Sequence, residues 1–223
     1  MQPTHIEGVY KQQDRIFTEN PENCRGLQVY NERLVPYEGR EFRSWNPHRS
    51  KLASAILKGL KNIKIKPNYN VLYLGAATGT TVSHISDIVK NGIVYAVESS
   101  PIALKKLLMV SEKRKNIIPI LSDANHPERY SAIVSPVDLV YQDISQRNQT
   151  EIFVKNIKKY LKVDGQGIMM VKARSIDVSS KPKETYDIVV NQLKKYGFDI
   201  VDKKDLSLYE KDHAVILVSL KKF

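Results

Sequence analysis

The stretch VLYLGAATGTT at residues 71–81 decides the fold of this 223-residue chain. Its first four residues are apolar and predict a buried strand that ends at Gly75, and apolar residues at helical spacing over residues 80–89 predict a helix directly after it. A glycine-containing turn between a strand and a helix lets a ligand approach the backbone closely. The dinucleotide fingerprint is not matched, because Ala77 stands where its second glycine should be. An ordinary strand-to-helix turn is the alternative for this loop taken alone.

Apolar strands and amphipathic helices alternate along the chain on both sides of this stretch. The pattern predicts helices at 48–59, 79–92, from 101, at 151–162 and at 182–196, and strands at 70–76, 93–99, 116–124, 137–145, 165–175, 198–206 and 213–221. Such alternation is typical of an α/β fold with a mostly parallel sheet. We expect a Rossmann-like methyltransferase fold with seven strands, the last of them antiparallel, because two consecutive closing strands distinguish many methyltransferase sheets from dehydrogenases.

The first 46 residues have a different character. Short segments rich in β-branched and aromatic residues are separated by turn-forming residues, and they lie at 5–10, 15–20, 25–30, 32–39 and 41–45. We therefore expect a small antiparallel β region at 1–46 and a main domain at 47–223.

Trp45 stands at the border between these two parts, among basic residues. Two interpretations stay open: Trp45 packs the β region onto the main sheet, or it belongs to an RNA-contacting edge. The basic residues of that edge would be Arg43, His48, Arg49 and Lys51.

The charge balance favours a polyanionic partner. Lys and Arg number 35 against 24 Asp and Glu, a formal net charge of +11, which makes nucleic acid the leading partner. The alternative is that lysines merely solvate helix faces. No apolar run approaches the ~18 residues of a membrane helix, and the polar start lacks a secretory signal, so we expect a protein that stays in the cytoplasm. The single Cys24 excludes an internal disulfide, and the histidines predict no metal site.

Polar residues follow four strands at their carboxyl ends, where open α/β sheets bind ligands. They are the loop after Gly75, then Glu98, Asp123 with Ala124, and Asp143 with Gln146. An acid at the second strand can accept hydrogen bonds from ribose hydroxyls, one at the third can bind the adenine amine, and one at the fourth would face a methionine tail. Each alone can be a solvated strand end. Together they predict an adenosyl ligand.

Several long motifs occur in one order: LYLGAATGTTVSHISDIV, YAVE, NIIPILSDA, DLVYQDISQ, VKARSID and YEKDH. In these motifs the chain, from about Arg43 onward, resembles the fibrillarin family, specifically archaeal fibrillarin-like RNA 2′-O-methyltransferases. The glycine- and arginine-rich tail of eukaryotic fibrillarins is missing at the N-terminus. The resemblance implies S-adenosylmethionine (SAM) as cofactor, with no metal.

The resemblance also implies the site residues. The family's catalytic Lys-Asp-Lys-His set falls on Lys51, Asp143, Lys172 and His213. The SAM contacts fall on Gly75, Ala76, Gly79, Thr80, Thr81, Glu98, Ser99, Asp123, Ala124, Asp143 and Gln146. The chain departs from the family at Ser99, where an aromatic residue is frequent, and at Arg147, where proline is common. Without the resemblance, we would favour ordinary cations for the two lysines, and the histidine could equally be a structural residue at the start of the last strand.

The implied activity is transfer of a methyl group from SAM to a ribose 2′-hydroxyl of rRNA or tRNA. Lys172 is the candidate general base, oriented by Asp143, and Lys51 and His213 would position the ribose or its phosphate. The implied partners are a C/D-box guide RNA that selects the target, a Nop-domain scaffold protein and a kink-turn-binding protein. The alternatives are a methyltransferase acting on protein glutamine or another non-guided substrate, and a silent SAM-binding subunit. Arg174 and Ser175 lie near enough to Lys172 in sequence to help hold a phosphate.

Overall fold

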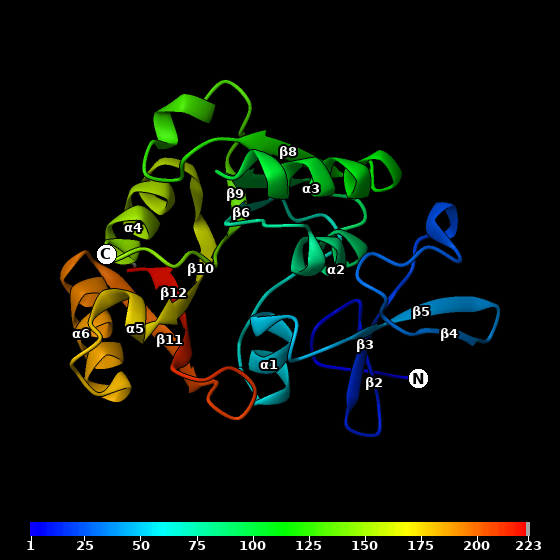
Figure 1. Cartoon of the computed structure of the whole chain (residues 1–223), viewed down its shortest axis with the longest axis horizontal. Coiled ribbons are helices and arrows are strands. Elements are labelled where there is room, and N and C mark those ends of the chain that lie inside the picture. Colours follow the sequence, from blue (N-terminus) through cyan, green and yellow to red (C-terminus); the bar gives the residue numbers. More distant parts are fainter. Residues whose placement is uncertain (222–223) are drawn as a thin grey trace.

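Seven strands form the larger sheet, in the spatial order β11-β12-β10-β9-β6-β7-β8 (Figure 1). The structure, a computed structural model, describes residues 1–221. Strands β10, β9, β6, β7 and β8 are mutually parallel, whereas β12 runs antiparallel to both β10 and β11. The strands are β6 (Val71–Leu74), β7 (Val94–Glu98), β8 (Ile117–Leu121), β9 (Val137–Gln142), β10 (Leu161–Lys172), β11 (Phe198–Asp205) and β12 (His213–Leu220). The expected seven-stranded, mostly parallel sheet is confirmed.

Helices cover both faces of this sheet, because alternate residues of each strand point to opposite sides. Tyr73 and Tyr141 belong to the core under α1–α3, whereas Leu72 and Val140, their neighbours in sequence, belong to the core under α4 and α6. The helices are α1 (Lys51–Leu57), α2 (Thr80–Ile88), α3 (Pro101–Lys113), α4 (Gln149–Tyr160), α5 (Ala173–Ile176) and α6 (Pro182–Lys195), with 3-10 turns η1 (Glu22–Cys24) and η2 (Pro127–Tyr130). No helix within residues 1–221 is both long and apolar enough to span a bilayer.

The direction of chain progression reverses between β6 and β9. From β6 the chain moves outward through β7 to β8, then returns to β9 on the other side of β6. The connections on the two sides leave in opposite directions, and in open α/β sheets the ligand crevice lies at the carboxyl ends of the strands that flank such a reversal, here β6 and β9. The fold thereby fixes where a ligand site should lie.

The N-terminal residues form a second, antiparallel sheet in the order β1-β2-β3-β5-β4, which confirms the expected small β region. Its strands are β1 (Gln2–Pro3), β2 (Val9–Gln12), β3 (Arg15–Glu19), β4 (Leu34–Tyr37) and β5 (Arg40–Trp45). The expected strand at 25–30 is wrong. The backbone amides of Val29 and Tyr30 do not pair with a neighbouring strand, because the Glu32 carboxylate accepts them at 3.0 Å and 2.8 Å.

A buried charge network joins the small sheet to α2 and α3. It consists of Glu32, Arg43, Asp87 and Arg114. The Arg43 guanidinium lies 2.6 Å from a carboxylate oxygen of both Glu32 and Asp87, and Arg114 Nε lies 3.1 Å from the other oxygen of Asp87. The Arg43 side chain is fully buried. Its expected place on an RNA-contacting edge is therefore wrong, because its charge is satisfied by carboxylates inside the protein.

Trp45 packs between the two parts of the molecule. Its ring is 1% exposed and stacks on His84 of α2, with 4.7 Å between ring centroids. The interpretation of Trp45 as a packing residue is confirmed, and the two sheets share one hydrophobic core on this side.

Candidate active site

The loop after β6 is clamped from two sides. Gly75 has φ +83°, a left-handed conformation, and a Cβ at this position would lie 2.3 Å from the backbone oxygen of Asp143. On the other side, the Ala77 amide donates to Glu98 Oε2 at 2.7 Å. Gly79, with φ +93°, then caps the N-terminus of α2. The loop therefore presents its backbone in one fixed shape beside the carboxyl end of β9.

Replacing Gly75 with alanine should impair both folding and SAM binding, because the new Cβ would collide with backbone that has no room to move. We expect a lower thermal midpoint and at least about a tenfold weaker SAM affinity, since tenfold corresponds to only ~1.4 kcal/mol. Gly59→Ala is the matched control: Gly59 also has positive φ, at +75°, but nothing lies within 4 Å of its Cβ position. Equal losses of SAM affinity in both variants, measured by calorimetry, would contradict the steric argument.

The acidic residues at the neighbouring strand ends converge on the same edge of the sheet. Glu98 ends β7, and its second carboxylate oxygen accepts the Ser100 amide at 2.7 Å. Asp123 accepts the backbone N–H of Asn125 at 2.9 Å, which lowers the pKa of its carboxyl group. The Asn125 side chain also donates to Gln146 at 2.8 Å. Asn125 thus joins the third and fourth strand ends, a role that sequence reasoning missed because an asparagine in a loop carries no distinctive signal.

Four chemically active side chains meet beside this loop: Lys51, Asp143, Lys172 and His213, here called the strand-end cluster. In the ladder between β10 and β12, Lys172 lies directly opposite His213. Asp143 stands two residues after Tyr141, and Lys172 two after Met170, so both share the sheet face that packs under α1–α3. β12 is antiparallel, and its beginning therefore lies at the carboxyl edge of the parallel strands.

Lys51 joins the strand-end cluster from α1, the helix that packs over this face of the sheet. Ser50 caps α1, which places Lys51 at the first helical position, and its ammonium donates to both carboxylate oxygens of Asp143 at 2.9 and 3.0 Å. Both side chains remain 20% exposed, so a ligand can still reach them. The sequence led us to expect Asp143 beside Lys172. The structure instead pairs it with Lys51, and among residues 1–221 no hydrogen-bond partner of the Lys172 ammonium is found.

Burial favours the neutral form of His213. The residue is 8% exposed, and burial lowers the pKa of its ring; the hydrogen bond to Lys211 opposes this shift, and the nearby Lys51 cation adds to it. Its Nδ1 lies 2.7 Å from the Lys211 carbonyl oxygen. A carbonyl accepts only a donor, so we assign the hydrogen to Nδ1, and Nε2 is left as an acceptor for a ligand hydroxyl.

A hydroxyl pair connects the glycine loop with the helix that carries Lys51. Thr81, the second residue of α2, donates through Oγ1 to Ser50 Oγ at 2.9 Å. Thr81 is 7% exposed, so its side chain serves this internal contact, while Thr80 before it is half-buried at the helix N-terminus. The sequence gave no sign of Ser50 as part of the site. The remaining expected residues are placed at the loop and strand ends, with Ala76 and Ala124 buried and Ser99 exposed.

Arg174 lies close to the strand-end cluster but points to another partner. Its Nε is 3.3 Å from Asp212, and it belongs to α5, a one-turn helix that interrupts the strand expected at 165–175. The phosphate-holding role considered for Arg174 therefore competes with an ion pair inside the protein.

Stability should fall as the solution is acidified below about pH 6.5. Burial lowers the pKa of His213 and, more strongly, that of His84, which also lies near the Arg43 and Arg114 cations. The unfolded chain, with histidine pKa of about 6.5, then binds protons that the folded chain does not, which costs up to ~1.4 kcal/mol per pH unit per histidine. Urea unfolding at pH 7.5, 6.5 and 5.5 measures this. In His213→Asn the slope should drop by up to one proton, and a slope identical to wild type would contradict it.

The strand order with its antiparallel β12 and the acid-lined strand ends define the class of SAM-dependent methyltransferases. The fibrillarin family model matches residues 1–222. This chain belongs to the fibrillarin family.

Individual relatives agree over almost the whole chain. The fibrillarin-like rRNA/tRNA 2′-O-methyltransferase of Methanothermobacter thermautotrophicus is 47% identical over 213 residues, covering 96% of this chain and 94% of the relative. Aeropyrum pernix fibrillarin, solved with natively bound SAM, is 42% identical with a TM-score of 0.87 and 96% of each chain covered. A fibrillarin solved in complex with Nop5p is 43% identical with a TM-score of 0.88, covering 98% of this chain and 100% of that one.

Proposed function

We propose that this chain transfers a methyl group from SAM to a ribose 2′-hydroxyl of rRNA or tRNA, at nucleotides chosen by a C/D-box guide RNA. The observation that carries this proposal is the strand-end cluster, in which two lysines, an aspartate and a neutral histidine meet beside the glycine loop. The relative named as an rRNA/tRNA 2′-O-methyltransferase supports it.

The residues around the crevice fit SAM. Gly75 packs directly against the backbone of Asp143, which fixes the position of the loop that SAM would contact. Glu98 and Asp123 keep carboxylate lone pairs beyond their internal hydrogen bonds, and these would accept from the ribose hydroxyls and the adenine amine. Asp143 and Gln146 would hold the methionine end. When bound, SAM supplies a methyl group made electrophilic by the sulfonium charge.

The strand-end cluster would prepare the ribose for attack. The Lys51 ammonium and His213 Nε2 offer a donor and an acceptor on one side of the crevice, which fixes the sugar in one orientation. Lys172, in its unprotonated form, would accept the 2′-hydroxyl proton at Nζ as the oxygen attacks. Asp143 holds the Lys51 ammonium through an ion pair. Lys51 and Lys172 can therefore both lie near one site without approaching the same atom.

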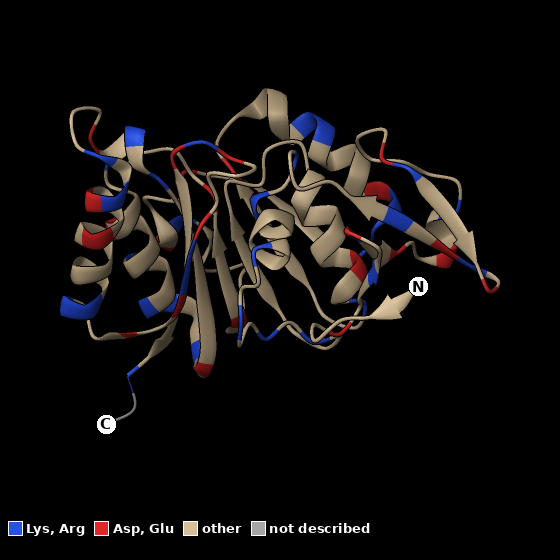
Figure 2. Cartoon of the chain, turned by 90° about the horizontal axis from the view of Figure 1, so that it is seen from below, with Lys and Arg blue, Asp and Glu red and all other residues tan. Residues whose placement is uncertain are grey.

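The charge of the chain suits an RNA-containing particle. Lys and Arg occur along the whole length of the molecule, from the helices at the left to the strands at the right in the view of Figure 2. A net charge of +11 attracts the phosphate backbone. The related fibrillarin in complex with Nop5p supports a Nop-domain scaffold as partner. The guide RNA, a kink-turn-binding protein and a cytoplasmic location complete the proposal.

Reconstitution tests the proposed function. The chain is combined with labelled SAM, a scaffold protein, a kink-turn-binding protein, guide RNA and target RNA, and the methylated nucleotide is mapped. Methylation should appear at one 2′-hydroxyl and move when the guide sequence is changed. Methyl incorporation into protein, or into RNA without a guide, would favour the non-guided alternative, and SAM binding without any transfer would favour a silent subunit.

A further inference from the structure

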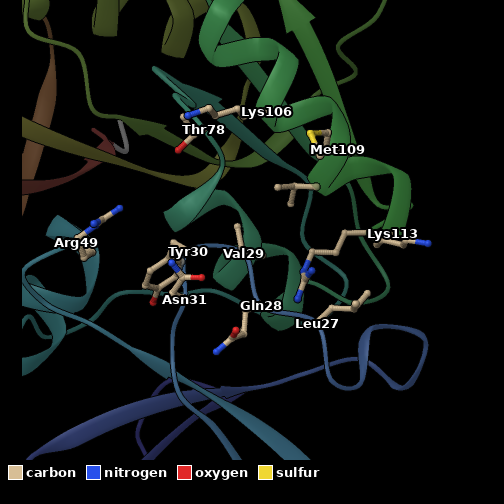
Figure 3. Close-up of a pocket in the computed structure, with 12 residues that line it drawn as sticks. Leu27, Gln28, Val29, Tyr30, Asn31, Arg49, Thr78, Lys106, Met109 and Lys113 are labelled. Atoms are coloured by element: carbon tan, nitrogen blue, oxygen red, sulfur yellow. The ribbon is translucent and has the colours of Figure 1, made fainter.

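A hollow of about 580 Å³ lies between α3 and the loop at residues 27–31, next to the glycine loop. We call it the α3 hollow. Figure 3 shows Lys106 reaching from α3 toward Thr78, with Arg49 extending toward them from the opposite wall. Thr78 belongs to the loop that begins at Gly75, and Arg49 precedes Lys51 by two residues. Through these two residues the α3 hollow borders the glycine loop and the segment that leads into α1, the helix that begins at Lys51.

Cations flank an apolar middle part of the α3 hollow. Arg49, Lys106 and Thr78 lie at one end, Val29 and Met109 lie in the middle, and Lys113 lies beside Leu27 at the other end (Figure 3). Arg114 also lines the hollow, but its guanidinium is paired with Asp87. Among residues 1–221, no acidic side chain lines the hollow. Apolar surface beside cations matches an unpaired nucleotide, which offers a flat base and a phosphate.

Internal hydrogen bonds hold the wall at residues 27–31. The Glu32 carboxylate, itself bound to the buried Arg43, accepts the amides of Val29 and Tyr30. The Tyr30 hydroxyl donates to the Ser44 carbonyl at 3.0 Å and lies 2.8 Å from His84 Nε2. Little conformational entropy would be lost when this wall binds a ligand.

We propose that the α3 hollow binds a nucleotide of the RNA strand adjacent to the methylated one, with its phosphate between Arg49 and Lys106 and its base against Met109. This inference rests on the proposed function. An RNA strand that places a ribose in the strand-end cluster must continue past it, and the α3 hollow is the neighbouring basic opening. An apolar protein segment would bury the two cations without a counter-charge, whereas every nucleotide carries one.

Binding of a short single-stranded RNA of mixed sequence to the free protein, measured over a range of salt concentrations, tests this directly. Arg49→Gln and Lys106→Gln should each weaken binding about fivefold and lower the slope of log affinity against log salt by ~0.7, the value for one lost phosphate contact. Met109→Ala should weaken binding without changing the slope. Lys105→Gln is the matched control, because Lys105 is exposed on the same helix but does not line the hollow.

Three results separate the possibilities. The same effects in the reconstituted particle, seen as a higher KM for target RNA, would support the proposal. Losses no greater than in the control would overturn it, as would variants that keep RNA affinity but no longer bind the scaffold protein, which would make the hollow a protein-docking surface. If the wild-type particle methylates nothing, the proposed function fails, while the RNA-binding measurement still decides the role of the hollow.

Discussion

Lys172→Ala should reduce the rate of methyl transfer by about 10²- to 10⁴-fold, the usual contribution of a general base. SAM affinity should stay close to wild type, because the residues expected to hold SAM lie on the glycine loop and the other strand ends. Single-turnover transfer in the reconstituted particle gives the rate, and calorimetry on the free protein gives the affinity.

Two variants sharpen this test. Lys195→Ala removes an exposed lysine at the end of α6, just before β11 begins opposite the far end of β12 from His213, and should transfer at the wild-type rate. Lys51→Ala removes the partner of Asp143 and should weaken both SAM binding and transfer. Unchanged transfer by Lys172→Ala would remove Lys172 from the chemistry and leave positioning alone as the origin of the rate.

Arg43→Met should destabilise the protein by about 3–5 kcal/mol, the range found when one partner of a buried ion pair is removed. The variant leaves Glu32 without a cationic partner and Asp87 with Arg114 alone, inside a core that no water reaches. Urea unfolding measures the loss of free energy.

Arg40→Met is the matched control in the same strand. Its guanidinium is 41% exposed and lies 3.2 Å from Glu19, so removing it should cost no more than about 1 kcal/mol. Equal losses in the two variants would mean that the buried charge network contributes no more than a surface pair.

The Arg43 result also bears on the proposed division at residues 46 and 47, because a domain of residues 47–223 alone would keep Asp87 and Arg114 but lose Arg43.

The sequence predicted the large sheet well because its signals are local. Apolar runs that end in glycine or an acid mark strands of a doubly covered sheet, and the alternation with helices determines the parallel topology. The segment at 25–30 misled us for the same reason. Val29 and Tyr30 have strand-forming side chains, but their amides are taken by Glu32, a contact that depends on the buried position of Arg43.

The site was predictable in its residue types but not in its pairings. Family motifs located all four members of the strand-end cluster. The ion pair between Lys51 and Asp143 joins residues 92 positions apart, and no periodic pattern in the sequence indicates such a contact. Arg43 was misplaced because a basic residue two positions before a tryptophan suggests RNA binding, whereas its partner Asp87 lies 44 positions further along the chain.

The position of β12 in the larger sheet has a consequence for biosynthesis. This strand lies between β10 and β11, yet the ribosome makes it after every other strand of that sheet. A nascent chain can therefore form the cofactor loop early, but it has no His213 opposite Lys172 until residues 213–220 have emerged and inserted between two strands already made. Under the proposed roles of Lys172 and His213, methyl transfer therefore requires that residues 213–220 have been made and have inserted into the sheet.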